Sequence, residues 1–149
     1  MTELTGLVPM GLGDLTLRLG CALLASFVIG WERETKEKAA GLRTNLLVGL
    51  GSALVILVPI QVGAVAQSVD TLGRSLQGVM TGVGFVGGGA VMQKDRVKGL
   101  TSAAALWVSA ALGIAAACGQ WQLSVMGALV AWFVLRVVNQ VEKTVSRRP

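Results

Sequence analysis

Long apolar runs alternate with short polar segments along the whole chain. Each run covers about 16–20 residues, enough for an α-helix to cross a bilayer core of about 30 Å. The pattern predicts an all-α, polytopic membrane protein that forms a single domain over residues 1–149. The five predicted transmembrane helices lie at about residues 15–30, 45–65, 75–92, 100–118 and 123–138.

The composition agrees with a membrane protein and argues against an enzyme. Hydrophobic residues make up 53% of the chain and charged residues 14%, whereas a soluble domain carries about 25% charged residues. There is no histidine, so the commonest general base and metal ligand is missing. Neither a serine elbow nor a clear metal-ligand cluster is present. We therefore expect no catalytic residues and no cofactor beyond a candidate Mg²⁺ ion.

The distribution of basic residues predicts the topology. The net charge of +5 needs no nucleic-acid partner, because cytoplasmic connections of membrane proteins are rich in Lys and Arg. With residues 30–44 in the cytoplasm, only Arg18 and Arg74 lie toward the other face. We predict an outside N-terminus, a cytoplasmic C-terminus and no soluble C-terminal domain. The cytoplasmic basic residues are then Arg33, Lys36, Lys38, Arg43, Lys94, Arg96, Lys98, Arg136, Lys143, Arg147 and Arg148.

The segment 30–44 carries seven charged residues between two apolar runs. Three interpretations are open: a solvated anchor, a docking surface, or a lock in which Arg33 and Arg43 pair with nearby carboxylates beneath helix N-termini. Thr44 is expected to cap the second span. The candidate functional residues of this segment and of the next charged connection are Glu32, Arg33, Glu34, Lys38, Arg43, Thr44, Asp95, Arg96, Lys98 and Thr101.

Two of the polar segments resemble each other. Residues 38–44 and 96–102 both read basic-x-x-Gly-Leu and then a hydroxyl residue at the start of an apolar run. Such a match arises either from a parallel repeat, a known transporter design, or from chance similarity of capping residues. A true repeat would bring the N-termini of the second and fourth spans together on the cytoplasmic side.

The third span is rich in glycine. Its small-xxx-small spacing favours close helix packing, while a helix broken at Gly87–Gly89 would expose backbone to an ion path. A formal dinucleotide fingerprint in this span is rejected because no strand precedes it. The candidate packing or ion-path residues are Gly78, Gly82, Gly84, Gly87, Gly88 and Trp107.

Acidic residues at both faces supply the candidate metal ligands. Asp70 and Arg74 are candidates for an outer-face site. Because Mg²⁺ prefers carboxylate oxygen and water, a Mg²⁺ site is assigned to Glu32, Glu34 and Asp70. The acids all lie at or near span ends, whereas ion paths are usually marked by acids inside the membrane.

Three ordered motifs resemble the MgtC/SapB family of bacterial inner-membrane proteins and together span about residues 15–140. The first is Gly30-Trp31-Glu32-Arg33-Glu34 with Lys38-Ala39-Ala40-Gly41-Leu42-Arg43-Thr44. The second is Asp70 and Arg74 before Gly82-Val83-Gly84-Phe85-Val86-Gly87-Gly88-Gly89. The third is Val97-Lys98-Gly99-Leu100-Thr101-Ser102-Ala103-Ala104-Ala105-Leu106-Trp107, in which Lys98 replaces the usual Arg.

The resemblance implies a multi-pass protein of the bacterial inner membrane with a role in magnesium or ion homeostasis, virulence and stress adaptation. One expectation is Mg²⁺ or H⁺ transport through the glycine-rich span. The other is a regulatory protein that transports nothing and binds another membrane complex, such as the F-type ATP synthase. The glycine face is suited to self-association, so we also expect a homodimer in the lipid bilayer.

Overall fold

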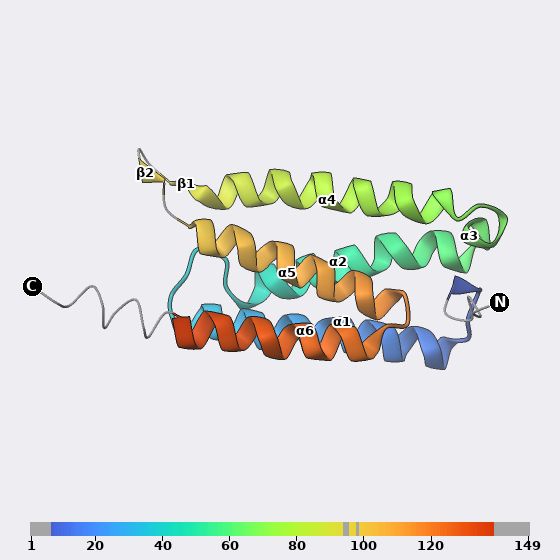
Figure 1. Ribbon diagram of the computed structural model, residues 1–149, viewed down its shortest axis with the longest axis horizontal. Helices are drawn as coiled ribbons and strands as arrows, with labels where there is room; N and C mark the ends of the chain where they lie inside the picture. The colour runs from blue at the N-terminus through green and yellow to red at the C-terminus, as the bar shows by residue number, and fades with distance from the viewer. Residues whose placement is uncertain (1–6, 94–95, 98, 139–149) are drawn as a thin grey trace, which may run out of the picture.

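The computed structural model describes residues 7–93, 96–97 and 99–138. Helices dominate this part of the chain, and one two-stranded antiparallel ladder interrupts them (Figure 1). The order of elements is α1 (Leu12–Thr35), α2 (Leu42–Gln61), α3 (Ala64–Gln67), α4 (Asp70–Val91), β1 (Met92–Gln93), β2 (Arg96–Val97), α5 (Leu100–Ala117), α6 (Trp121–Phe133) and the π-helical η2 (Val134–Val138).

The long helices lie side by side and alternate in direction (Figure 1). Helix α5 is central and packs against α1, α2, α4 and α6. Helix α4 lies at one edge against α5 and α2, and α6 lies at the other against α1 and α5. Both α2 and α5 therefore begin at the end of the bundle where α1 and α4 finish.

Small side chains fill much of the core, which lets the helices approach closely. Ala22, Ala53 and Ala117 are fully buried together with Ile56 and Ile60. Helices α2 and α5 come closest where two glycines face each other. A Cβ atom on Gly113 would lie 2.2 Å from the carbonyl oxygen of Gly49. Within a membrane such close van der Waals packing drives helix association, because lipid is as apolar as the side chains.

The segment 30–44 is not the loop that the apolar pattern predicts. Helix α1 continues to Thr35, and α2 already begins at Leu42. The connection is therefore limited to residues 36–41. An ion pair between Glu32 and Lys36, one helical turn apart, supports the extra turn of α1. The predicted cap at Thr44 is wrong, since Gly41 occupies the N-cap and Thr44 lies inside the first turn of α2.

Three of the described helices, α1, α2 and α5, are long and apolar enough to cross a membrane. Helix α4 has the length, at 22 residues, but it combines many glycines with Asp70 and Arg74. Helix α6 is shorter and continues into η2. The structure thus confirms a helical membrane protein. The number of five spans and the orientation of the termini stay predictions.

Candidate functional site

Buried polar side chains gather at the end of the bundle where α1 finishes and where α2 and α5 begin (Figure 1). Glu32, Arg33, Asn45 and Ser102 are each at most 3% exposed. Burying a charged or polar group is unfavourable unless it is paired or hydrogen-bonded. The partners of these side chains therefore show what holds this end of the bundle together. We call these four residues, together with Glu34, Lys36 and Ser109, the polar-end cluster.

Arg33 ties α1 to α5. Its Nη2 atom donates a hydrogen bond to the Ser102 Oγ atom at 2.8 Å, and both side chains are buried. Ser102 is the third residue of α5, which follows the left-handed Gly99 at its N-cap. Arg33 therefore lies at the start of α5, where it donates to a hydroxyl group and not to the carboxylate that the lock interpretation expects. Arg43, the other arginine of that interpretation, is exposed.

Glu32 faces a different partner on the same helix. Its Oε1 atom pairs with the Lys36 ammonium group one turn later. The Lys36 Nζ atom also donates a hydrogen bond to the carbonyl oxygen of Leu135, 3.3 Å away in the π-helix η2. The Glu32 Oε2 atom is buried and receives no hydrogen bond within the described residues. Lys36 therefore bridges a carboxylate of α1 to the end of the α6–η2 helix.

Glu34 has a separate role and points away from Glu32, because residues two apart lie on opposite sides of a helix. Its Oε2 atom accepts a hydrogen bond of 2.8 Å from the backbone N–H of Leu42. A carboxylate at a helix N-terminus satisfies a free N–H group and is favoured by the helix dipole. Glu34 therefore supplies the cap that Thr44 was predicted to supply. A Cβ atom on Gly41 would lie 2.0 Å from the same carboxylate oxygen, so a side chain there would displace the Glu34 carboxylate from this position.

Asn45 joins α2 to α5 and was missed in the sequence. Its Nδ2 atom donates to the carbonyl oxygens of Ala40, at 3.2 Å, and Gly41, at 2.8 Å. Its Oδ1 atom accepts from the Ser109 Oγ atom at 2.8 Å. Both side chains are fully buried. The sequence does contain a signal for this contact, because Asn45 and Ser109 each lie inside an apolar run and a buried polar group requires a partner.

The other predicted residues of this end are less enclosed. Lys38, Arg43 and Thr101 are exposed. Arg96 contributes its backbone to β2, while Asp95 and Lys98 lie outside the described residues. In the charged segment, Glu32 and Arg33 on α1 are therefore buried, whereas Glu34, Glu37 and Lys38 are exposed.

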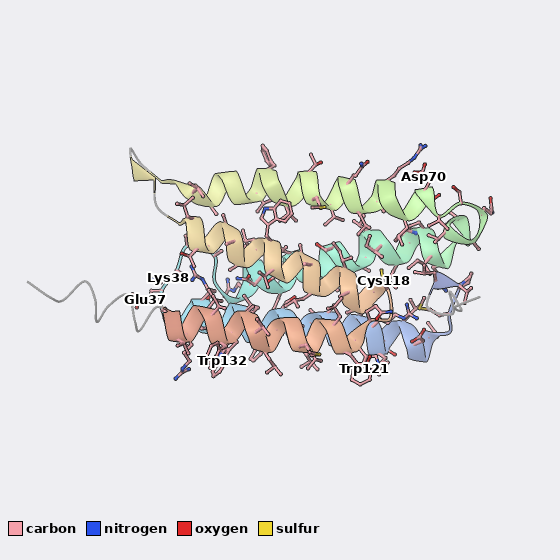
Figure 2. The ribbon with its side chains drawn as sticks, viewed as in Figure 1. Glu37, Lys38, Asp70, Cys118, Trp121 and Trp132 are labelled. Carbon is pink, nitrogen blue, oxygen red and sulfur yellow. The ribbon has the colours of Figure 1, made fainter. Side chains whose placement is uncertain are left out.

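The outer-face pair lies at the opposite end of the bundle (Figure 2). The Asp70 Oδ2 atom is 2.8 Å from the Arg74 Nε atom, and both side chains are largely exposed, at 66% and 80%. Asp70 is thus far from the polar-end cluster. The candidate Mg²⁺ ligands Glu32 and Glu34 therefore lie at one end of the bundle and Asp70 lies at the other, and the described residues contain no group of three acidic or thiol side chains suited to a metal.

The glycines of α4 divide into a packed one and an open set. Gly87 is buried, and a Cβ atom there would lie 3.5 Å from the Cβ atom of Ala103 and 4.0 Å from the Trp107 Nε1 atom. Helix α4 runs through Gly87–Gly89 without a break, so the broken-helix alternative is not found. A Cβ atom would meet nothing within 4 Å at Gly78, Gly82, Gly84 or Gly88.

Comparison with known proteins places these residues in a family. The MgtC family profile matches residues 19–144. The chain is 39% identical to protein SrpB of Synechococcus elongatus over 140 residues, which cover 87% of this chain and 77% of SrpB. It is 38% identical over 133 residues to the Escherichia coli protein named "Putative magnesium transporter YhiD", and 35% identical over 133 residues to protein MgtC of Salmonella typhimurium.

The chain spans 62% of the length of YhiD and 54% of that of MgtC. These alignments cover 86% and 89% of the present chain. No solved structure matches it. The family profile matches the chain from α1 to η2, and three relatives are more than 30% identical to it. Both findings agree with the family motifs, the first of which contains Glu32, Arg33 and Glu34 of the polar-end cluster. The chain is a membrane protein that belongs to the MgtC family.

Proposed function

We propose that the protein is a multi-pass protein of the bacterial inner membrane in which α1, α2, α4, α5 and α6–η2 each cross the bilayer. The polar-end cluster then lies at the cytoplasmic face, and Asp70 lies at the outer face. Alternation of the long helices supports this topology, as does the excess of basic residues in the segments at the polar end. Labelling of a C-terminal tag from the cytoplasmic side tests the orientation, and labelling from the outside would contradict it.

The protein takes part in magnesium and ion homeostasis and in stress adaptation, as a regulator that binds another membrane protein such as the F-type ATP synthase. The observation that carries this proposal is the polar-end cluster itself. Its buried hydrogen bonds join α1 and α2 to α5, so a change in one of them alters how three helices meet. The neighbouring exposed residues Lys38 and Arg43 offer a charged surface to a partner at the same face.

Transport of Mg²⁺ or H⁺ is the second candidate, and the printed name of the relative YhiD favours it. In an unbroken helix the backbone carbonyl groups accept hydrogen bonds from the next turn. The carbonyl groups of residues 84–87 are therefore engaged within α4, and transport through them requires a local opening of that helix. The contact of Gly49 with Gly113 likewise closes the space between α2 and α5.

A homodimer through α4 completes the proposal. Val79, Val83 and Gly87 form the buried side of α4. The other side carries the exposed glycines together with Gln77, Thr81 and Phe85, which are also exposed. An amide side chain facing lipid is unfavourable, and a second copy would supply both polar partners and close backbone contact.

Reconstitution in liposomes separates the two candidates. The purified protein is tested for Mg²⁺ and H⁺ flux with internal dyes, beside protein-free liposomes and the variant Glu32→Gln. The proposal expects no flux above the protein-free control and recovery of a stable complex with another membrane protein from the native membrane. Flux that disappears in Glu32→Gln or Asp70→Asn would establish transport instead.

A further inference from the structure

The Lys36 ammonium group lies in an oxygen-lined position that suits a cation. On one side it contacts the Oε1 atom of Glu32, which is buried. On the other side it donates to the Leu135 carbonyl oxygen at 3.3 Å. The Lys36 side chain is itself 29% exposed, so the position is open to the aqueous end of the bundle through the lysine.

The oxygen atoms at this position are not fully used by the lysine. The Glu32 Oε2 atom is buried without a hydrogen-bond partner among the described residues. Leu135 lies in the π-helix η2, a rare form of helix that is common at functional sites. A buried carboxylate with one free oxygen atom, facing a backbone carbonyl, offers the hard oxygen ligands that Mg²⁺ takes together with several water molecules.

We infer that Glu32 and the Leu135 carbonyl form a cation site that Lys36 fills as a tethered counter-ion, and that free Mg²⁺ competes with the ammonium group for it. A compact ammonium on a flexible stem can leave without a change of backbone. Its departure opens the carboxylate to the aqueous end and breaks the bridge from α1 to η2. The choice of Mg²⁺ rests on the proposed role in magnesium homeostasis, whereas the site itself rests on the geometry.

The expected affinity is low. One carboxylate provides few protein ligands, and the Arg33 guanidinium group on the same helix adds a repelling positive charge. Cation sites with few charged ligands fall in the range of about 0.1–1 mM. The tethered ammonium weakens apparent binding further, because the metal must displace it before it can bind.

The variant Lys36→Met removes the competing charge and keeps most of the length of the side chain. It removes the paired charge of the buried Glu32 carboxylate and leaves only the neighbouring Arg33 guanidinium group to balance it, which is destabilising. We expect the midpoint Tm of the purified full chain in detergent to fall, and MgCl₂ at 10 mM, a chosen concentration on the order of ten times the expected dissociation constant, to raise it by about 4 °C. NaCl at equal ionic strength should leave it unchanged.

Matched variants isolate the site. In Lys36→Met with Glu32→Gln the carboxylate is gone, so the Tm should no longer respond to MgCl₂. The variant Lys38→Met changes an exposed lysine two residues away and should behave as the native protein. An equal rise of Tm in NaCl, or a Mg²⁺ response that persists in the double variant, would overturn the inference.

The native chain supplies a second measurement that does not depend on the stability of a variant. An amine-reactive reagent should modify Lys36 slowly, because Glu32 and Leu135 hold its ammonium group. MgCl₂ should increase the rate severalfold at Lys36 and leave the rate at Lys38 unchanged, as read by peptide mass spectrometry. Equal changes at both lysines would contradict displacement. Both the Mg²⁺ response of the Tm and the Mg²⁺ effect on Lys36 modification are measured on the purified chain alone. They would therefore be unchanged if no partner complex were found, which separates failure of the proposed function from failure of this site.

Discussion

Arg33 on α1 and Ser102 on α5 are joined by a 2.8 Å hydrogen bond between two side chains that are almost completely buried. The pair spans 69 residues of sequence. The guanidinium group carries several donors in a fixed plane, and loss of an acceptor leaves part of a buried charge unsatisfied. This contact should therefore be among the more sensitive in the bundle.

Replacing Ser102 with alanine should lower the free energy of unfolding by about 1–3 kcal/mol, because the Arg33 donor is then left without its acceptor. Denaturation of the purified protein in mixed micelles measures the change. The control is Thr101→Ala, on the neighbouring exposed residue, which should stay within about 0.5 kcal/mol of the native value. Equal losses in the two variants would show that the hydrogen bond contributes nothing specific.

Gly113→Ala should destabilise the bundle by about 1–3 kcal/mol, since the new Cβ atom would lie 2.2 Å from the Gly49 carbonyl oxygen and must push α2 away from α5. Gly51→Ala is the matched change, at a position with nothing within 4 Å. It should raise stability by up to about 1 kcal/mol through helix propensity. Thermal unfolding of both variants gives the comparison, and a neutral Gly113→Ala would refute the close approach of the helices.

Glu34→Ala should cost about 1 kcal/mol, the usual effect of removing an N-cap acceptor, because the Leu42 N–H group loses its partner. Glu34→Gln retains an acceptor oxygen and should recover part of that loss. Glu37 is exposed on the same connection, and Glu37→Ala serves as the control in the same unfolding series. A larger loss in the control than in Glu34→Ala would assign the effect to the connection as a whole.

Asn45 and Ser109 should show coupled energetics. Single replacements of each by alanine, together with the double replacement, form a double-mutant cycle. We expect an interaction energy of about 0.5–3 kcal/mol, the range for residues in one hydrogen-bond network, since the Ser109 hydroxyl donates to the Asn45 Oδ1 atom at 2.8 Å. Additive losses would show that the two side chains contribute independently.

Gly82→Leu should convert the proposed dimer to a monomer without unfolding the chain, because the added side chain blocks close approach of two α4 helices, while Gly82 is exposed and a Cβ atom there meets nothing within 4 Å. Size-exclusion chromatography with light scattering in detergent reports the mass. Gly51→Leu adds the same side chain on α2, at a position where a Cβ atom also meets nothing within 4 Å, and should keep the dimer. A native protein that is monomeric under all detergent conditions would exclude the dimer.

The apolar pattern predicts the positions of the long helices well but not their ends. The prediction for the first span stops near residue 30, where charged residues begin, while α1 continues to Thr35. Charges four residues apart on a helix stabilise it as well as apolar contacts do, and a pattern of hydrophobicity does not register them. The N-terminal cap of α2 could not be predicted for another reason. Its acceptor, Glu34, belongs to α1, and its contact with the Leu42 N–H group depends on how the two helices meet.

The glycine pattern in the sequence likewise does not predict where the helices pack closely. The density of glycine in α4 drew attention to that span, yet Gly49 of α2 and Gly113 of α5 allow a close approach of two backbones outside it. Close approach depends on which residues face each other in space, and one sequence does not contain that information. The motif around Glu32 and Arg33, by contrast, contains two of the buried charged side chains of the polar-end cluster.

The separation in sequence between partners also sets an order of events during synthesis. Glu32 can meet Lys36 as soon as the first helix winds, because the two are one turn apart. Arg33 has to wait for Ser102, and Lys36 has to wait for Leu135, 99 residues later. Until α5 is made, the Arg33 guanidinium group of the nascent first hairpin therefore lacks its hydroxyl acceptor. A guanidinium group in that state stays at the membrane–water interface, and it becomes buried only when the later helices pack against α1.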